Sequence, residues 1–444
     1  MTAIFALGAF IAAIVLWNVV FKRNIAEAMF VGFVAAAGFA GADFFPVLWK
    51  GFLSGIQNEV VFAALAFVIV GEILTKAGII QRIVDILSSM LGRLRGGSIY
   101  AATVGSGVFG AVAHNGAATA ATVGAITIPW IKRSNASGET AAVVLGGNSG
   151  VGAVFPFSGA FFLLLAAPTV TGVVSAQTMA LTAFIAALWM VVVRLVSAFF
   201  LIRKQKVGAM DPEDVKPLRV TFLLGWTSLL VLAAVALPIL ATSGTFVTDR
   251  VGEDAFDAVP VLVWLPVAML LPGLIVGRKQ LPRTGRAWWD MFGKISPKLG
   301  IVAVTMISAF SASDVISKLG LSKQMTPLLA MLNGVPAIVV AIIVGIIIII
   351  VAGPLSTTAT LAAVGSVAFA ALTAAGIPAP LAFAALLIWA ASESASPPGA
   401  APLYVAAGIA GVDPVKTFFP VIMYYLIPTF LLGVLIAVGV LWIP

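Results

Sequence analysis

Long apolar stretches, separated by short polar or basic segments, dominate the sequence. A membrane-spanning helix needs about 20 mainly apolar residues, and stretches of about that length lie at 3–20, 26–48, 56–72, 140–168, 176–202, 220–242, 258–276, 296–313, 380–410 and 419–443. A transmembrane β-barrel would instead alternate apolar and polar residues, whereas residues 337–352 are apolar throughout. We therefore predict an all-α polytopic membrane protein. The first residues have neither a basic leading region nor a small-residue cleavage site, so we expect no removable signal peptide.

Two further apolar stretches, 97–131 and 331–376, are split by polar, Gly or Pro residues, as in pairs of short spans or in re-entrant hairpins. Short cytoplasmic loops carry an excess of Lys and Arg. Most basic residues collect near 22–23, 76–95, 132–133, 203–219, 278–298 and 416. If all these loops face the cytoplasm, each split stretch enters and leaves on one side, which favours hairpins. Both termini and the acidic loop with Asp249, Glu253, Asp254 and Asp257 then lie outside, on the periplasmic side.

The sequence also repeats itself. Residues 72–79 match residues 314–321 in their acidic, hydroxyl, Lys and Gly positions, at an offset of 242. Residues 115–124 align with 356–365 at an offset of 241, and the same offset carries Pro156 onto Pro397. We therefore predict two repeats, 1–215 and 216–444, each with five spanning helices and a re-entrant hairpin. The first contains the hairpin 97–131 and an interrupted helix 140–168; the second contains the hairpin 331–376 and an interrupted helix 380–410. An odd number of spans makes the repeats inverted, which is typical of secondary transporters.

Composition excludes several classes of function. The 444 residues are 61% hydrophobic and only 9% charged, whereas soluble proteins are about a quarter charged. Zero cysteines and a single histidine leave no thiolate metal site, disulfide or Cys nucleophile. We find no catalytic constellation in one membrane plane and expect no enzyme. The net charge of +8 is mostly a topology signal, so we expect no nucleic-acid partner.

Polar and helix-breaking residues interrupt the apolar sequence in four clusters. Irregular backbone is tolerated at membrane depth only where it is buried in protein or lines a wet cavity, so we expect the four clusters to converge. The candidate substrate- and ion-binding residues are Ser106, His114, Asn115, Gly116 and Thr119 in the first cluster, Gly147, Asn148, Ser149, Gly150 and Ser158 in the second, Ser356, Thr357, Thr358 and Thr360 in the third, and Glu393, Ser394, Ser396 and Pro397 in the fourth.

The residue types indicate the chemistry of such a site. Half-helix N-termini attract an anion, and freed carbonyl and hydroxyl oxygens coordinate Na⁺, which we place near Asn115, Asn148, Ser356 and Ser394. We expect Na⁺, with H⁺ as the alternative coupling ion, and no organic cofactor. No Lys or Arg lies in the tips, so backbone N–H groups, hydroxyls and bound cations would hold an anionic substrate. Small polar residues are also ordinary packing devices in membrane helices.

Three ionisable residues in apolar surroundings have competing interpretations. Glu393 either binds Na⁺, carries a proton or pairs with a donor from another helix. His114 is either a proton relay or, as we favour, a neutral hydrogen-bonded imidazole. Arg194 either faces the substrate or, as we favour, snorkels or pairs.

Residues 79–95 predict an interfacial helix with Ile79, Ile83, Ile86, Met90 and Leu94 on its apolar face and Gln81, Arg82, Asp85, Ser88 and Ser89 on its polar face. The run 286–292 is similar.

Several short motifs carry a resemblance to a known family. The segments 71–78, 94–97, 109–111, 128–129 and 146–147, with 396–399 and 404–411 near the C-terminus, resemble the large, DctM-type membrane subunit of tripartite ATP-independent periplasmic (TRAP) transporters. The resemblance covers nearly the whole chain and is strongest across 60–165 and 385–444. It implies an elevator-type, Na⁺-driven importer of organic acids in the bacterial inner membrane. It also implies two partners, a small four-helix membrane subunit (DctQ-type) and a periplasmic substrate-binding protein (DctP-type).

Two other functions remain open from the sequence. A stand-alone, gluconate-type carboxylate/H⁺ symporter would use Glu393 or His114 for proton coupling. A channel, which is a less favoured interpretation, would conduct without saturable, ion-coupled uptake.

Overall fold

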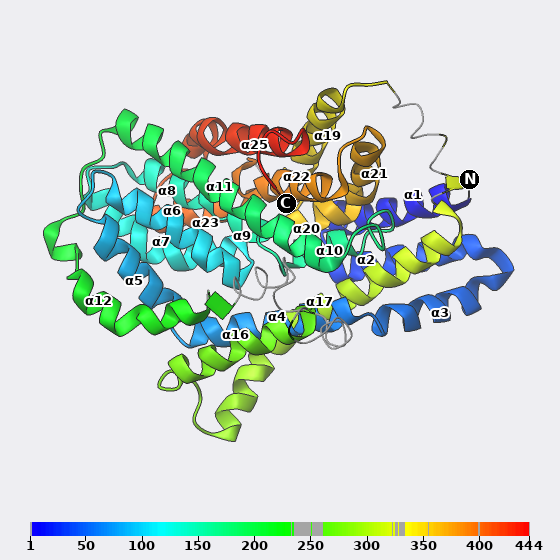
Figure 1. Cartoon of the computed structure of the whole chain (residues 1–444), viewed down its shortest axis with the longest axis horizontal. Helices are drawn as coiled ribbons and strands as arrows, with labels where there is room; N and C mark the ends of the chain where they lie inside the picture. Colours follow the sequence, from blue (N-terminus) through cyan, green and yellow to red (C-terminus); the bar gives the residue numbers. More distant parts are fainter. Residues whose placement is uncertain are drawn as a thin grey trace.

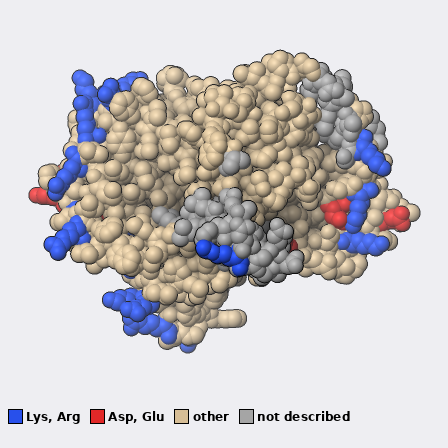
Figure 2. Space-filling model, viewed as in Figure 1, with Lys and Arg blue, Asp and Glu red and all other residues tan. Residues whose placement is uncertain are grey.

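The computed structural model describes residues 2–231, 233–234, 250, 261–321, 323–324, 327, 334–353, 355–397 and 400–443. Every regular element in these ranges is helical, and none of the described residues forms a strand. The all-α prediction is therefore confirmed. Helices α5–α8 lie toward one end of the molecule and α1–α3 toward the other (Figure 1). Figure 2 shows that Lys and Arg gather mainly near the edges of this face, with a broad uncharged surface between them, as expected for a lipid-facing protein.

The first helices lie close to the predicted spans 3–20, 26–48 and 56–72. They are α1 (Thr2–Val15), extended by a π-helical turn (Leu16–Val20), α2 (Ile25–Ala37), α3 (Phe44–Ile56) and α4 (Glu59–Lys76). The predicted span 26–48 lies within a candidate membrane span, Ile25–Ile56, which a 3₁₀ segment (Gly38–Asp43) divides into α2 and α3. Gly41 in that segment has φ of 61°, a conformation that glycine adopts without steric cost. Asn24 and Asn58 cap the N-termini of α2 and α4.

Both split stretches form helical hairpins. In the first, α6 (Gly97–Ala113) packs against α7 (Gly116–Arg133), and the chain turns at His114 and Asn115. Asn115 caps α7 by accepting the Ala118 backbone N–H at 2.8 Å. In the second, α19 (Ala337–Ala352) is followed by α20 (Thr357–Thr360), a π-helical turn (Leu361–Gly365) and α21 (Ser366–Ala374), with Ser356 as the N-cap. These turns lie inside the predicted ranges, although residues 331–333 and 354 are outside the described residues.

Both interrupted helices are also broken near the predicted positions. The first consists of α8 (Gly138–Asn148), α9 (Val151–Val154) and α10 (Gly159–Leu165), with a bend of 42° after α9. The second consists of α22 (Ala379–Ala390), a 3₁₀ segment η7 (Ala391–Ala395) and α23 (Ala401–Ala410). Residues 398–399 of the second break are outside the described residues.

The remaining described helices are α5 (Ile79–Leu91), α11 (Ala176–Gln205), α12 (Leu218–Gly225), α16 (Val261–Gly277), α17 (Gly285–Lys318), α24 (Phe418–Val421) and α25 (Ile427–Ala437). In the described residues, five helices are long and apolar enough to cross a membrane, or up to seven if each bent pair is one span. The predicted acidic loop and part of the span 220–242 lie outside the described residues. The run 286–292 and the span 296–313 form one 34-residue helix, α17, which continues through Pro297.

The predicted faces of the interfacial helix are partly wrong. Helix α5 ends at Leu91, before Leu94, and Met90 and Leu94 are exposed. Ser88 and Ser89 are buried instead, and Ser89 accepts a hydrogen bond from Thr221 of α12 at 3.0 Å. The part of the polar face of α5 that contains Ser89 therefore packs on α12, which the sequence of α5 alone does not reveal.

Helix α22 forms the centre of the packed interior. All twelve of its residues except the first three are buried, and it contacts α11, α19, α21 and α25. Trp389 is wholly buried and its indole N–H donates to the Phe430 carbonyl at 3.1 Å. Gly345 and Gly433 leave the space that this indole occupies, since a Cβ at either position would collide with the ring. The buried α22 holds the adjoining break at residues 391–397 in place.

Candidate functional site

The four polar clusters meet around Glu393. Its Oε2 accepts a hydrogen bond from the backbone N–H of Thr357, which joins the fourth cluster to the third. A Cβ atom added at Gly116 would lie 3.8 Å from Glu393 Oε1 and 3.5 Å from the carbonyl oxygen of Ser149. Residues of all four clusters therefore lie within a few ångströms of one carboxylate, as the sequence-based argument on irregular backbone expects.

Glycines in the first interrupted helix permit this close approach. A Cβ at Gly150 would collide with the Ala391 carbonyl oxygen and lie 2.5 Å from Ser394 Oγ. A Cβ at Gly159, next to Ser158, would lie 3.5 Å from Thr358 Cγ2, which is an ordinary van der Waals distance. The second cluster thus touches both the third and the fourth, and backbone contact at Gly150 is the tightest of these approaches.

His114 occupies the turn of the first hairpin in a left-handed conformation, with φ of 50°. Its Nε2 lies 3.2 Å from the Pro156 carbonyl oxygen, and because a carbonyl only accepts, Nε2 carries the proton and donates. The imidazole also lines an apolar cavity of about 260 Å³, together with Phe67, Phe157 and Met269. This geometry matches the hydrogen-bonded interpretation of His114 and ties the first cluster to the second.

Asn148 is fully buried at the end of α8. Its Nδ2 donates to Thr103 Oγ1 of α6 at 3.0 Å, while its Oδ1 has no hydrogen-bond partner. Thr103 was not among the predicted site residues, although it lies three residues before Ser106 and hence on the same side of α6. A single Thr in a stretch rich in Ala and Gly carries no chemical signature of its own.

Several buried oxygens at the site lack partners. Besides Asn148 Oδ1, these are Ser106 Oγ and Thr360 Oγ1. A buried polar atom without a hydrogen bond costs about 1–3 kcal/mol, so native proteins rarely leave such atoms unmatched. Neutral oxygens of hydroxyl, amide and carbonyl groups are suitable ligands for a hard cation such as Na⁺. Each of these oxygens is therefore of the type that binds an alkali cation.

Other predicted residues are satisfied by their own backbone surroundings. Thr119 donates to the Asn115 carbonyl, Ser149 to Leu145, Ser394 to Ala391 and Ser396 to Ser392. Ser158 and Ser356 cap α10 and α20, and Ser356 also contacts the hydroxyl of Thr358 at 3.2 Å. Gly147 packs on the Tyr425 ring, and Pro397 lies in the second break. These contacts shape the tips and match the packing interpretation of small polar residues.

Arg194, for which the sequence left two interpretations open, lies next to the candidate site. It is 1% exposed, and its Nη1 donates to the Tyr425 carbonyl oxygen at 3.0 Å, so it pairs within the protein rather than snorkelling. Tyr425 in turn packs on Gly147, beside Asn148. The guanidinium Nε and Nη2 have no hydrogen-bond partner among the described residues.

A further charged contact joins two long helices. Lys298 of α17 and Glu72 of α4 form an ion pair with an N···O distance of 2.5 Å. Their side chains are 46% and 34% exposed, respectively. The sequence placed Glu72 in a repeated segment whose counterpart, Asp314, pairs instead with Lys318 one turn away on the same helix.

Comparison with known proteins identifies relatives of this fold. The profile of a family described as the DctM component of tripartite ATP-independent periplasmic transporters matches residues 3–442. A TRAP transporter large permease protein of Haemophilus influenzae is 32% identical over 85 residues, which cover 19% of this chain and 21% of the relative. The match thus spans about a fifth of the length of that relative.

Two solved transporter structures share the architecture. The YdaH transporter of Alcanivorax borkumensis has a TM-score of 0.63 at 17% identity, covering 89% of this chain and 88% of its own. MtrF of Neisseria gonorrhoeae, described as illuminating a class of antimetabolite efflux pumps, has a TM-score of 0.63 at 15% identity, covering 90% and 85%. At these identities the likeness concerns the fold alone.

Proposed function

This chain belongs to the DctM component family of tripartite ATP-independent periplasmic (TRAP) transporters, and from that membership we propose that it imports a small organic acid together with Na⁺. The large permease component of such a system is a secondary transporter, not an enzyme. The observation that best supports a binding site is the convergence of four helix breaks on Glu393, since broken helices in transporters provide substrate and ion sites.

The two bound species would use different groups of the site. Na⁺ would be held by the oxygens near Asn115, Asn148, Ser356 and Ser394, with the unpartnered buried oxygens as added ligands. A substrate carboxylate would lie at the N-termini of α7 and of the helix that begins at Thr357, where partial positive charge collects. No Lys or Arg lies in the tips, so the bound cation would also offset the charge of the substrate.

The remaining parts of the proposal follow from the family. The two inverted repeats, 1–215 and 216–444, would supply one hairpin and one interrupted helix each to a moving domain, in an elevator mechanism. A DctQ-type membrane subunit and a DctP-type binding protein would complete the system. The protein would be located in the bacterial inner membrane with both termini in the periplasm, in accord with the distribution of basic residues.

Reconstitution tests this proposal. Proteoliposomes that contain this chain and its cognate small subunit would be assayed for uptake of labelled carboxylates, delivered by the binding protein, with and without a Na⁺ gradient. We expect saturable uptake that requires Na⁺. Uptake that is unaffected by removing Na⁺ at every pH, or ionic current without saturation, would contradict Na⁺-coupled transport.

Two matched variants locate the site. Thr357→Leu places a bulky apolar group beside the Glu393 carboxylate and should abolish uptake while the protein still inserts. Thr373→Leu is the control, because Thr373 lies in the same hairpin arm and its hydroxyl bonds only to carbonyls of its own helix. Equal uptake by the two variants would remove the third cluster from the site.

Proton coupling is a second candidate, as in a gluconate-type carboxylate symporter. It is favoured by one observation, the partly buried location of the Glu393 carboxylate at the meeting point of the tips. Uptake driven by a pH gradient in Na⁺-free medium would support this alternative over Na⁺ coupling.

A further inference from the structure

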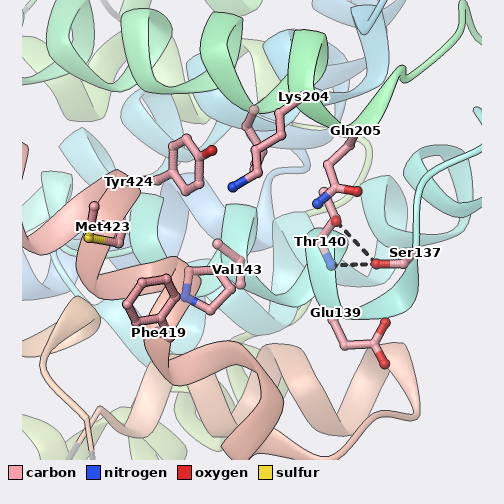
Figure 3. A pocket seen from close by; sticks show the side chains of 11 residues that line it. Ser137, Glu139, Thr140, Val143, Lys204, Gln205, Phe419, Met423 and Tyr424 are labelled. Atoms are coloured by element: carbon pink, nitrogen blue, oxygen red, sulfur yellow. Dashed lines mark hydrogen bonds between the residues drawn. The ribbon is translucent and has the colours of Figure 1, made fainter.

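A cavity separate from the meeting point of the tips is lined by the 11 residues that Figure 3 draws as sticks. It has a volume of about 450 Å³ and is enclosed by the start of α8, the end of α11 and the segment from α24 to the π-helical turn η9 (Ile422–Leu426). The end of α11 leads into a basic segment, which the distribution of Lys and Arg places on the cytoplasmic side. The cavity therefore lies near a membrane–water boundary.

One wall of this cavity is apolar. Val143, Leu201, Phe419, Pro420 and Met423 line it, and Phe419 and Met423 are 71% and 47% exposed. Large apolar side chains exposed at the edge of a cavity in a membrane protein are suited to contact a hydrocarbon chain. A soluble carboxylate would gain nothing from such a wall.

The opposite rim is polar, but most of its groups are already satisfied. Ser137 caps α8 by accepting the Thr140 backbone N–H at 3.1 Å, and the two hydroxyls contact each other at 3.1 Å. The Glu139 carboxylate points away from Lys204 (Figure 3) and interacts electrostatically with Lys416. Glu139 lines the cavity but forms no ion pair with Lys204.

Lys204 supplies an unpaired positive charge to the rim. Its ammonium points toward Tyr424 (Figure 3), whose ring centre is 5.7 Å from Nζ, and it forms no ion pair with any residue that the structure describes. Gln205 adds a side-chain amide next to it. A cationic and hydrogen-bonding rim above an apolar wall matches the phosphate and acyl chain of a lipid.

We propose that this cavity binds a membrane phospholipid, with the lipid phosphate on Lys204 and Gln205 and an acyl chain along Leu201, Phe419 and Met423. The site goes beyond the proposed transport function and does not depend on the substrate or the coupling ion. The bound lipid would join the ends of α8, α11 and α24 at the membrane surface.

Thermal unfolding of the purified full-length chain in detergent micelles tests this inference. Four additives would be compared: dioleoyl phosphatidylglycerol, dioleoyl phosphatidylethanolamine, dioleoylglycerol without phosphate, and glycerol phosphate without acyl chains. We expect both phospholipids to raise Tm by about 2 °C, while the two incomplete molecules do not. A rise with dioleoylglycerol equal to that with phosphatidylglycerol, or with glycerol phosphate alone, would overturn the proposal.

Single substitutions test which side chains contact the lipid. Lys204→Gln should raise about fivefold the phosphatidylglycerol concentration that gives half-maximal stabilisation. Met423→Gln should also weaken the binding of phosphatidylglycerol. Lys206→Gln is the control, because Lys206 is exposed only two residues away and does not line the cavity. If lipid stabilisation is the same in Lys204→Gln and Lys206→Gln, the cavity is not a phosphate site. Because neither variant touches the transport tips, this outcome is independent of any uptake result.

Discussion

The guanidinium carbon of Arg194 lies 4.9 Å from the centre of the Tyr425 ring, and Nη1 donates to the carbonyl oxygen of the same residue. No acidic side chain in the described part of the chain forms an ion pair with Arg194. A buried charge without a counterion is costly, and replacing buried charges by apolar groups of similar volume is often neutral or stabilising. Arg194 is therefore a residue that stability alone does not account for.

Arg194→Met should leave Tm unchanged or raise it, because it removes this charge and keeps much of the side-chain volume. The Tyr425 carbonyl keeps a partner, since Thr429 Oγ1 donates to it at 2.6 Å. Arg203→Met, on the exposed end of the same helix, is the matched control for loss of an arginine. A fall in Tm of several degrees in Arg194→Met alone would mean that the guanidinium is a stabilising element.

Alanine substitutions at three glycines should reduce uptake and Tm by amounts that follow the tightness of the contacts at each position. Gly150→Ala places a Cβ against the Ala391 carbonyl and should cost about 2 kcal/mol or more, with loss of uptake. Gly116→Ala meets Pro402 Cγ at 3.0 Å, a tight contact that should slow uptake, and Gly159→Ala meets Thr358 Cγ2 at 3.5 Å and should be tolerated. Uptake and Tm of the three variants, measured side by side, check this order. Full activity and an unchanged Tm of Gly150→Ala would contradict the tight contact between the second and fourth clusters.

Glu393→Gln removes the negative charge at the meeting point of the tips but keeps the size and hydrogen-bonding capacity of the side chain. The glutamine carbonyl still accepts the Thr357 N–H, but the negative charge that would attract a cation is gone. Under Na⁺ coupling we expect the Na⁺ concentration for half-maximal uptake to rise at least about tenfold, with normal insertion. The control is Glu59→Gln, at the exposed start of α4. If the variant keeps both its Na⁺ dependence and its pH profile, the carboxylate is structural.

The Glu72–Lys298 pair should contribute little to stability. Each side chain is more than a third exposed. Ion pairs between exposed side chains typically contribute less than about 1 kcal/mol to the free energy of unfolding. A double-mutant cycle with Glu72→Gln and Lys298→Met, measured by unfolding in low and high salt, should give a coupling energy in that range that falls as salt is added. A coupling energy of about 3 kcal/mol that is insensitive to salt would mean that the bilayer shields the pair from water.

Helix breaks were the features that the sequence predicted best. Asn115 and Ser356 are N-cap residues that follow turn or helix-breaking residues, and local backbone chemistry sets where such helices begin. The same logic located the break after α22, because Pro397 cannot continue a helix. Local signals of this kind act within a few residues, so the sequence predicts them without knowledge of the tertiary structure.

Contacts between distant segments could not be predicted in the same way. The pairing of Glu393 with the Thr357 backbone, and of Asn148 with Thr103, depends on how whole helices pack. The errors have the same origin: Pro297 lies within α17 without ending it, and Ser89 faces another helix rather than water. The break at Gly41 was missed because one glycine in an apolar stretch resembles the many glycines that pack inside helices.

The bond between Glu393 and the Thr357 amide has a consequence for any anion that approaches this helix start. The chain's own carboxylate already occupies the donor, so it behaves as a tethered competitor present at high local concentration. An incoming anion can accept from the Thr357 N–H only in the fraction of molecules whose competitor has swung away, and its apparent affinity for that donor is lowered by that fraction. Weak binding of a transported anion would then follow from the architecture, and release on the far side would be assisted by the returning side chain.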